Sequence, residues 1–335
     1  MKSMRYAAIS GWGMAVPRRI VTNEELAQRI ETSDAWIRSR TGITQRHVAG
    51  PDEPTSALAV AAGREALVRA GIPPEMVDMV IVATCTPDRP FPATACTVQQ
   101  RLGITHSGAF DLAAACSGFV YGLSVGTSLI RSGASQTLLL IAADVFTHLI
   151  DWEDRNTCVL FGDGAGAVVL QATDQPFGVL ASNTGAWGAG EELMAVDVGG
   201  TLMPATAALL EQRRQYVYMN GREIFKHAVR GMCESAEQAL ADAAVTLDEI
   251  RLVVPHQANV RIIEALAKRL NLPMDRVFVN LDRYGNTSAA SVPIALYESA
   301  QQGRLAQGDL VLLTAFGGGL TWGSCVLRWG SPVPV

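Results

Sequence analysis

The sequence predicts an α/β fold in which helices cover the sheets, because strand-like and helix-like segments alternate along its 335 residues. In the first half of the chain, β-rich apolar runs span residues 77–84 and 137–143, and helical stretches span residues 55–70 and 117–131. In the second half, apolar residues recur at intervals of three and four over residues 223–243, which is the spacing of a helix with one buried face.

The rest of the second half repeats this alternation. Further strands are expected at residues 251–255, 309–314 and 321–328, and further helices at residues 258–270 and 287–301. Nothing in this part of the chain resembles a low-complexity segment or a long flexible linker.

Two similar α/β halves are expected, residues 1–177 and residues 178–335, although the letters themselves show no clear repeat. A chain of this length suits two domains of about 100–200 residues each. One segment, residues 197–215, fits neither the helix period nor the strand period. We expect it to be a variable loop or cap, with Arg213 and Arg214 exposed to solvent.

Composition and charge disfavour several classes of protein. The net charge is −5 and the pI is about 5.6, whereas nucleic-acid-binding domains are normally basic. The first residues lack the apolar stretch of a signal peptide, and the most apolar run, residues 138–143, is far too short to cross a bilayer. We therefore expect a soluble, cytoplasmic protein that binds neither nucleic acid nor membranes.

The six cysteines do not form a metal or redox motif, because no two of them make a C-x-x-C pair. We expect no metal site, and we expect the thiols to stay reduced. Five of the six are expected to be small buried hydrophobic side chains.

Two glycine clusters resemble phosphate-binding loops without completing one. After the cluster at residues 11–13, Val16 stands where a dinucleotide loop has its third glycine. The cluster at residues 162–166 precedes a strand instead of the helix that a phosphate cradle needs. Both clusters are expected to form tight turns, and an NAD-dependent enzyme is disfavoured.

Cys116 is a candidate nucleophile. It lies in the sequence DLAAACSGF, where a short strand ends in small residues and an apolar helix follows. At a helix N-terminus, the helix dipole and the unpaired N–H groups favour the thiolate. Taken alone, such a cysteine is as typical of a buried structural thiol as of a nucleophile, so other segments must supply its partners.

Three further segments carry groups that can act with a cysteine. His256, in VVPHQAN, lies between a strand and a helix, where open α/β sheets place their sites, although a single histidine here also suits a structural role. Asn286, in YGNTSAAS, precedes a helix. Three consecutive glycines in FGGGLTWGS, at residues 317–319, allow backbone N–H groups to come close to a ligand.

Together these four segments resemble the β-ketoacyl-acyl-carrier-protein synthase III family of thiolase-fold condensing enzymes. The resemblance extends essentially from end to end and includes SDAWIRSRTGI at residues 33–43, DRNTCVLFGDGAGAVVL at residues 154–170 and MNGREIFKHAV at residues 219–229. It implies a thiolase-like five-layer αβαβα fold made of two similar halves, with the sites at the interface of the halves, and a homodimer.

The resemblance also implies a ping-pong reaction that initiates fatty acid synthesis. Cys116 would attack the thioester of an acyl-CoA and hold the acyl group, while the backbone N–H groups of Cys116 and Gly318 form the oxyanion hole. Malonyl-acyl-carrier protein would then lose CO₂, with His256 and Asn286 donating hydrogen bonds to the enolate. The carbanion would attack the acyl-cysteine and release a β-ketoacyl product, with no metal or redox cofactor.

Five side chains are expected on the same grounds to contact CoA. Trp36 and Arg40, four residues apart on one helical face, would bracket the adenine. Arg155 would contact a phosphate or the adenine, Asn259 the pantetheine arm, and Phe225 would lie at the tunnel. Without the resemblance, Trp36 and Arg40 would be interpreted as ordinary surface packing.

The acyl carrier protein is acidic in such systems, so its docking surface should be basic. Arg261 and Lys268 are seven residues apart and therefore share one face of the helix after His256. Arg269 and Lys226 are expected to join them. Glu264 lies in the same stripe and weakens its positive charge, so an ordinary solvated helix is the alternative.

Two residues are expected from the resemblance to shape the acyl pocket. Phe91, in PFPATAC, would reach across the dimer and close the partner's pocket, which favours short acyl groups. Leu320 follows the three glycines, where the family often has an aromatic residue, so the pocket beside Cys116 should differ in shape.

Other functions share parts of this pattern. A degradative thiolase needs a second cysteine in the C-terminal loop, where this chain has glycines, and Cys325 lies in the following strand. An acyltransferase of secondary metabolism, or a condensing enzyme that selects a polyketide starter, would use the same three residues and stays open. A non-catalytic partner subunit usually lacks the nucleophile, which this chain retains. A CoA-bound and a carrier-bound acyl donor both stay open as well.

Overall fold

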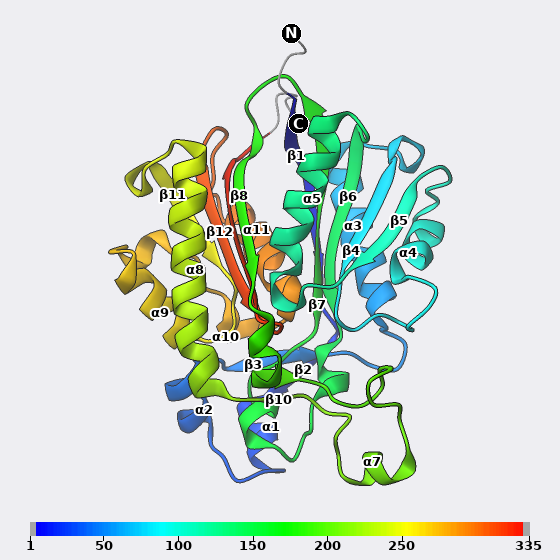
Figure 1. Cartoon of the computed structure of the whole chain (residues 1–335), viewed down its shortest axis with the longest axis vertical. Helices are drawn as coiled ribbons and strands as arrows, with labels where there is room; N and C mark the ends of the chain where they lie inside the picture. The colour runs from blue at the N-terminus through cyan, green and yellow to red at the C-terminus, as the bar shows by residue number, and fades with distance from the viewer. Residues whose placement is uncertain (1–4, 331–335) are drawn as a thin grey trace.

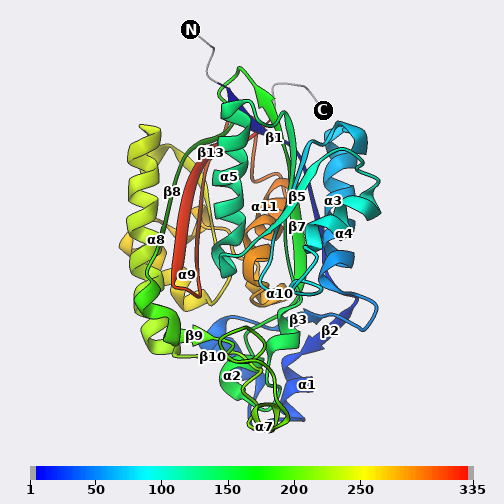
Figure 2. The same ribbon diagram turned by 45° about the vertical axis from the view of Figure 1, so that its right-hand side comes forward.

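The computed structural model describes residues 5–330 and shows the five layers that the resemblance implied (Figure 1). A five-stranded sheet and a four-stranded sheet lie face to face with two helices between them, and further helices cover the outer face of each sheet. Figure 2 shows α8 and α9 along one side and α3 and α4 along the other. The layer-forming helices are α3 (Thr55–Ala70) and α4 (Thr94–Leu102) outside the first sheet, α5 (Gly118–Ser132) and α11 (Ser291–Gln301) in the centre, and α8 (Gly221–Ala243) and α9 (Val260–Arg269) outside the second sheet.

The first sheet has the order β1-β7-β6-β4-β5. Strand β4 runs parallel to β5 and β6, whereas β7 is antiparallel to both β1 and β6. All eight residues of β6 are buried, as expected for a strand with helices on both faces of its sheet. The strands are β1 (Tyr6–Ala15), β4 (Met79–Ala83), β5 (Gly108–Leu112), β6 (Thr137–Asp144) and β7 (Gly164–Thr173).

The second sheet has the order β11-β12-β13-β8, in which β11 is parallel to β12 and the other pairs are antiparallel. Its strands all follow residue 177, and the strands of the first sheet all precede it. The proposed division into residues 1–177 and 178–335 stays a prediction about domain organisation. The strands are β8 (Gly178–Ala186), β11 (Ile250–Pro255), β12 (Leu310–Gly317) and β13 (Thr321–Arg328).

Smaller elements gather at one end of the layers, at the bottom of Figure 1. The segment 197–215 contains one short helix and otherwise irregular chain, and its Arg213 and Arg214 are partly exposed and form ion pairs with Asp151 and Asp197. The small elements are β2 (Arg19–Thr22), α1 (Asn23–Ala27), α2 (Asp34–Thr41), β3 (Gln45–Val48), α6 (Arg155–Cys158), β9 (Met194–Ala195), α7 (Ala207–Glu211), β10 (Tyr218–Met219) and α10 (Leu281–Tyr284).

The expectation that both glycine clusters form tight turns is wrong, because they lie largely in strands. Gly11 and Gly13 are inside β1, and a Cβ atom at either position would come within 2.2 Å of a carbonyl oxygen of α3. Gly164 and Gly166 are in β7, and a Cβ atom at Gly166 would be 2.7 Å from the ring of Pro293 on α11. The glycines therefore allow helices to pack directly on the backbone of the first sheet.

The cysteines are all free thiols, but two of them depart from the expected burial. Cys96 is exposed on α4 and Cys85 is partly buried after β4, whereas the other four are buried. Within residues 5–330, no helix is both long and apolar enough to cross a membrane.

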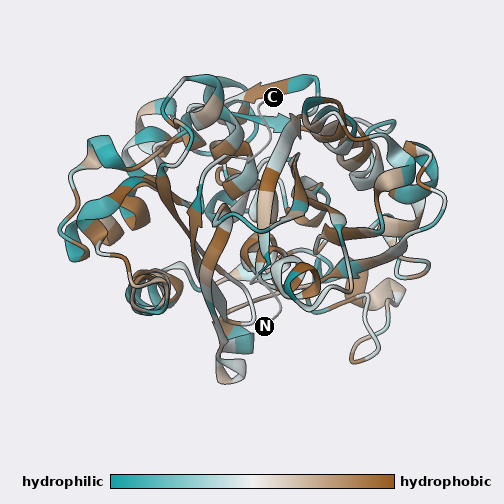
Figure 3. Cartoon of the chain, turned by 90° about the horizontal axis from the view of Figure 1, so that it is seen from above, coloured by the Kyte–Doolittle hydropathy of each residue, from teal (hydrophilic) through white to brown (hydrophobic). Residues whose placement is uncertain are grey.

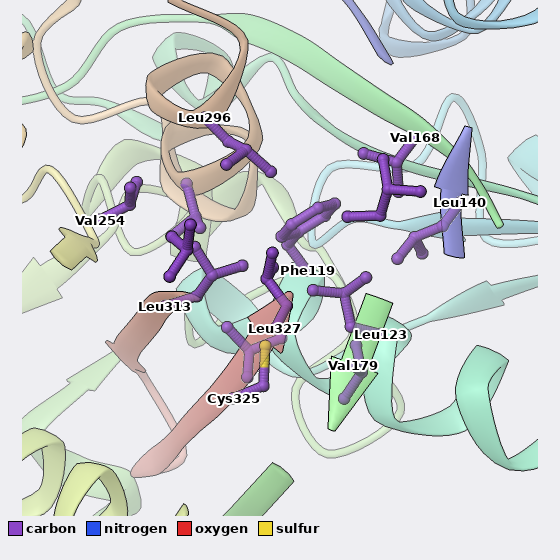
Figure 4. Close-up of a cluster of buried hydrophobic side chains, with 14 of the residues drawn as sticks. Phe119, Leu123, Leu140, Val168, Val179, Val254, Leu296, Leu313, Cys325 and Leu327 are labelled. Atoms are coloured by element: carbon purple, nitrogen blue, oxygen red, sulfur yellow. The ribbon is translucent and has the colours of Figure 1, made fainter. Parts of the chain in front are cut away.

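The central helix α5 joins the two sheets into one core. Phe119 and Leu123 point from α5 into a cluster with Leu140 of the first sheet and Leu313 of the second (Figure 4). Phe119 is completely buried. Hydrophobic residues concentrate along the strands, and hydrophilic ones lie mainly on the outer helices and loops (Figure 3). Burial of α5 from both sides fixes its N-terminus between the sheets.

Replacing Phe119 by alanine should lower the free energy of unfolding by about 3–5 kcal/mol, because it leaves a cavity between the sheets. Chemical denaturation followed by circular dichroism measures this change. Val125→Ala is the matched control on the same helix, since that side chain is 36% exposed, and it should change the stability by less than about 0.5 kcal/mol. Equal effects of the two substitutions would contradict the packing described here.

Candidate active site

Cys116, His256 and Asn286 line one cavity of about 470 Å³. Cys116 comes from the turn before α5, His256 follows β11, and Asn286 follows α10. The three side chains are far apart in the sequence, and the structure brings them together between the two sheets. Each is 5% exposed or less, so the cavity shields reacting groups from bulk water.

Cys116 lies in a 3₁₀ turn, Ala115–Ser117, that leads directly into α5, as the sequence predicted. Ala115 has φ of 45°, in the left-handed region that side chains rarely adopt, and such strain is typical of functional sites. A Cβ atom at Gly317 would lie 2.6 Å from the backbone nitrogen of Cys116. The glycine loop therefore packs against the backbone of the candidate nucleophile.

The surroundings of Cys116 act on the pKa of its thiol in opposite directions. Burial raises the pKa of the Cys116 thiol to about 12, and the nearby carboxylate of Asp144 raises it as well. A hydrogen bond from Ser288 and the backbone N–H of Cys116 act in the opposite direction and do not outweigh burial. The resting protein therefore carries a neutral thiol at position 116 at neutral pH.

His256 is a neutral imidazole whose orientation is set by Ser291. Burial lowers the pKa of His256 to about 3, and Nδ1 lies 2.6 Å from Oγ of Ser291 on α11. The backbone N–H of Gln257 donates to the same Oγ at 3.3 Å. The hydroxyl of Ser291 can donate its own hydrogen to Nδ1, and with that assignment the ring proton is on Nε2. His256 then has one N–H donor left, and the residue lines the cavity.

Asn286 is fixed by hydrogen bonds to the segment 160–162, which precedes β7 of the first sheet, and by a hydrogen bond within its own turn. Its backbone N–H donates to the carbonyl of Leu160 at 2.8 Å, and its carbonyl accepts from the N–H of Gly162 at 3.0 Å. Its side-chain Oδ1 accepts from the backbone N–H of Ser288 at 2.9 Å. The side-chain NH₂ group is thereby directed away from that turn, and Asn286 lines the cavity.

The loop 317–319 connects β12 and β13 beside Cys116. The hydroxyl of Thr321 donates to the carbonyls of Ala114 and Gly318 at 3.0 and 3.2 Å, which ties the loop to the strand end that carries the cysteine. Gly317, Gly318 and Leu320 line the cavity, and Leu320 is only 1% exposed. Leu320 therefore lies where the sequence predicted a residue that shapes the pocket.

All five residues expected to contact CoA line the same cavity as Cys116. Two guanidinium groups lie near the ring of Trp36, with Cζ of Arg40 at 5.7 Å and Cζ of Arg155 at 4.9 Å from its centroid. Phe225 is 37% exposed on α8, and Asn259 accepts a hydrogen bond from the N–H of Arg261 as the N-cap of α9. One cavity thus connects the side chains of Trp36, Arg40 and Arg155, which we call the rim, with the buried thiol of Cys116.

The basic residues expected to bind a carrier protein lie on α8 and α9, two helices whose N-terminal ends border the cavity. Arg261, Lys268 and Arg269 are exposed on α9, which packs against α8, where Lys226 is exposed. Arg261 also donates to the carbonyl of Ser39 at 2.9 Å, and Lys226 pairs with Glu223 at 2.8 Å. The structure adds Arg222, exposed on the first turn of α8 and part of the cavity lining, which sequence reasoning missed.

Phe91 lies outside the cavities of its own chain. Its side chain is 86% exposed, and within residues 5–330 it lines neither the cavity around Cys116 nor a second one of about 690 Å³. The second cavity adjoins the first at Gly318 and Met194, and Ala115 forms part of its wall. Its apolar lining includes Phe146, Leu149, Val196, Val198 and Val217.

Sequence reasoning also missed Ser288 and Ser291, although both stand in the quoted segment YGNTSAAS. Only the fold shows that Ser291 contacts His256, which is 35 residues earlier, and that Ser288 contacts Cys116, which is 172 residues earlier. Within residues 5–330, no group of three or more His, Cys, Asp or Glu side chains is arranged to hold a metal ion.

Comparison with known proteins agrees with the geometry of the site. A family model described as 3-oxoacyl-[acyl-carrier-protein] synthase III matches residues 110–188, and the model of its C-terminal part matches residues 240–329. The β-ketoacyl-[acyl-carrier-protein] synthase III of Roseiflexus sp. (strain RS-1) is 66% identical over 324 residues, which cover 97% of this chain and 98% of the relative. The chain belongs to the β-ketoacyl-acyl-carrier-protein synthase III family.

Solved structures of family members confirm the predicted thiolase-like fold. The crystal structure of 3-oxoacyl-[acyl-carrier-protein] synthase III from Aquifex aeolicus VF5 has a TM-score of 0.90 at 47% identity and covers 96% of this chain and 100% of its own. The priming β-ketosynthase from the R1128 polyketide biosynthetic pathway has a TM-score of 0.91 at 35% identity and covers 99% of both chains. The protein is therefore an acyl-transferring condensing enzyme, as the resemblance implied.

Alkylation of Cys116 by iodoacetamide should accelerate about tenfold for each pH unit between pH 7 and pH 10, without levelling off. The thiolate is the reactive form, and its fraction rises tenfold per pH unit at any pH well below the pKa. Mass spectrometry of the peptide that contains Cys116 measures the rate. A plateau below pH 9 would show that the resting thiol is far more acidic than its burial implies.

Proposed function

We propose that the protein initiates acyl-chain synthesis by condensing a short acyl group from acyl-CoA with malonyl-acyl-carrier protein through an acyl-thioester on Cys116. The observation that supports this most directly is the single cavity that joins the rim at Trp36 and Arg40 to Cys116, His256 and Asn286 at its base. The family relationship supports the same reaction class. The two substrates and the thiol of Cys116 supply all the reacting groups, and no further cofactor is part of the proposal.

In the first half-reaction, the sulfur of Cys116 attacks the thioester carbon of acyl-CoA. The carbonyl oxygen gains negative charge, and we assign the backbone N–H groups of Cys116 and Gly318 as its donors, because the glycine loop packs against the cysteine backbone. The bond from the acyl carbon to the CoA sulfur breaks, and CoA leaves with the proton. The small neighbours Ala114 and Ala115 leave room for the acyl group.

The rim of the cavity suits the nucleotide end of CoA. The indole of Trp36 offers a flat aromatic surface with the positive charges of Arg40 and Arg155 close to it. Arginine side chains bind phosphate groups well because their planar guanidinium donates several hydrogen bonds at once. Phe225 and Asn259, further along the lining, are assigned to the pantetheine arm.

In the second half-reaction, His256 and Asn286 donate hydrogen bonds to the thioester oxygen of malonyl-acyl-carrier protein. The malonyl C–C bond to the carboxylate breaks, CO₂ leaves, and the enolate charge develops on that oxygen. A neutral Nε2–H and an amide N–H are suitable donors, because neither loses its proton at neutral pH. The carbanion then attacks the acyl carbon on Cys116 and forms the new C–C bond. The bond from that carbon to the Cys116 sulfur breaks, the β-ketoacyl product leaves, and the Cys116 thiolate takes up a proton from solvent.

We assign carrier-protein docking to the exposed basic residues of α8 and α9, which are Arg261, Lys268, Arg269 and Lys226, and we add Arg222 to them. An acidic carrier protein would meet this surface with favourable charge. Their position on α8 and α9, whose N-terminal ends border the cavity, supports this assignment.

We also propose that the enzyme is a homodimer and works in the cytoplasm. Strand β5 is at the edge of the first sheet, where Phe110 is 37% exposed, and Phe91 is 86% exposed nearby. An exposed edge strand with aromatic side chains is suited to pairing with a second copy. Phe91 is assigned to the partner's acyl pocket in that arrangement, and the free thiols suit a reducing compartment.

A second candidate is the priming of polyketide synthesis with the same chemistry. The similarity to the priming β-ketosynthase of the R1128 pathway, at 35% identity over almost the whole chain, favours it. The two functions differ in the acyl starter and in the acyl carrier protein that accepts the product.

Incubation with a panel of acyl-CoAs should add one acyl group to the wild-type protein and none to Cys116→Ala, because the acyl group is held by that sulfur. Intact-mass measurement gives the result. Malonyl-acyl-carrier protein should then discharge the acyl group as a β-ketoacyl product. The fastest starter separates the two candidates, and discharge only to an alcohol or amine would contradict the condensation.

Arg40→Ala should raise KM for acyl-CoA about tenfold with little change in kcat, because the lost interaction with CoA is present in both the ground state and the transition state. Arg38→Ala is the matched control on α2, since Arg38 pairs with Asp34 and does not line the cavity. Steady-state kinetics with a saturating malonyl-acyl-carrier protein measures both. An unchanged KM in Arg40→Ala would remove this residue from the CoA site.

A further inference from the structure

The hydroxyl of Ser288 lies between two sulfur atoms. Its Oγ is 3.5 Å from Sγ of Cys116 and 3.8 Å from Sγ of Cys85, and both distances allow hydrogen bonds to sulfur. Ser288 is completely buried. In the part of the chain that the structure describes, no other side chain is hydrogen-bonded to the sulfur of Cys116.

The backbone fixes Ser288 in this position from two sides. Its N–H donates to Oδ1 of Asn286 at 2.9 Å, and the N–H of the next residue, Ala289, donates to Oδ2 of Asp144 at 3.2 Å. Ser288 has φ of 52°, in the left-handed region that favours glycine. A serine kept in this costly conformation beside a nucleophile indicates that its side chain has a function.

The second sulfur determines which way the Ser288 hydroxyl can point. The thiol of Cys85 donates to Oδ1 of Asp144 at 3.3 Å, so its sulfur offers Ser288 only lone pairs. The thiol of Cys116 can donate to Oγ of Ser288, whereas a Cys116 thiolate can only accept. When the Cys116 thiol donates to Oγ, the Ser288 hydroxyl can donate to Cys85, and it gains a better acceptor when Cys116 is a thiolate.

We propose that Ser288 is a further catalytic residue, whose hydroxyl turns from Cys85 to Cys116 and stabilises the developing thiolate during acyl transfer. In the resting protein, the Cys116 thiol donates to Ser288, and Ser288 donates to the sulfur of Cys85. As the S–H bond of Cys116 breaks and its bond to the acyl carbon forms, the hydroxyl donates to the Cys116 sulfur. The proton leaves on the CoA thiol, so Ser288 ends the step unchanged.

This role rests on the proposed function of Cys116 as the nucleophile, and the electrostatics of the site explain why it is needed. Burial and the nearby Asp144 both raise the pKa of Cys116, so the thiolate is costly in this cavity. The hydrogen bond from Ser288 lowers the same pKa. A donor to an ionised sulfur in a buried site is worth more than one in water.

The test compares the alkylation of Cys116 by iodoacetamide at pH 8 and pH 9 in the wild-type protein, Ser288→Ala and Ser288→Gly. We expect both substitutions to slow alkylation about tenfold at each pH, because both remove the hydrogen bond to the thiolate. Acyl loading from the preferred acyl-CoA should slow in parallel. Ser299→Ala is the control, since it removes a buried hydroxyl of α11 that bonds only to the carbonyl of Leu296, and it should leave the rate unchanged.

The glycine variant separates the hydroxyl from the backbone. Glycine adopts the positive φ without strain, so a slow Ser288→Ala with a normal Ser288→Gly would make the effect conformational and would overturn the proposal. Equal alkylation rates in all three proteins would also overturn it. A wild-type protein that no acyl-CoA loads would instead overturn the proposed function, because iodoacetamide reports on the sulfur without any substrate.

Discussion

The active site depends on the backbone pairing that holds Asn286 against the first half of the chain. Asn286 exchanges two hydrogen bonds with the segment 160–162, and that segment leads directly into β7 of the first sheet. The glycine loop makes a second such contact, because Gly317 packs on the backbone of Cys116. These two contacts bring Asn286 and the glycine loop, from the later part of the chain, to the cavity that Cys116 lines.

Burial imposes a common constraint on Cys116 and His256. The thiol and the imidazole are both neutral at rest, since burial raises the pKa of one and lowers the pKa of the other. In the proposed reaction, charge therefore develops only during the chemical steps and must be stabilised by hydrogen-bond donors. Ser288 contacts Cys116, Ser291 contacts His256, and the turn at Asn286 holds the side chain of Asn286, so one segment supports all three residues.

Local patterns in the sequence predicted many of the helices and strands. The features that were not predicted depend on contacts between segments that are distant in the sequence. Residues 55–70 were predicted with the bounds that α3 has, because an apolar stripe ends there at Gly71, which adopts a left-handed conformation. The glycine clusters at residues 11–13 and 162–166 were wrongly predicted to be turns. Their glycines are needed because α3 and α11, which are distant in the sequence, pack closely on these strands. The effect of burial on the pKa of Cys116 could not be predicted from the local sequence, because burial is a property of the whole fold.

The most direct test of the account is a single-turnover experiment on His256→Ala and Asn286→Ala with acyl-CoA and then malonyl-acyl-carrier protein. If the cysteine holds the acyl group while these two residues stabilise the enolate, both variants accumulate acyl-Cys116 at close to the wild-type rate and then discharge it at least about a hundredfold more slowly. Intact mass follows both steps. Normal discharge, or a failure to load in both variants, would contradict the division of roles between the two halves of the site.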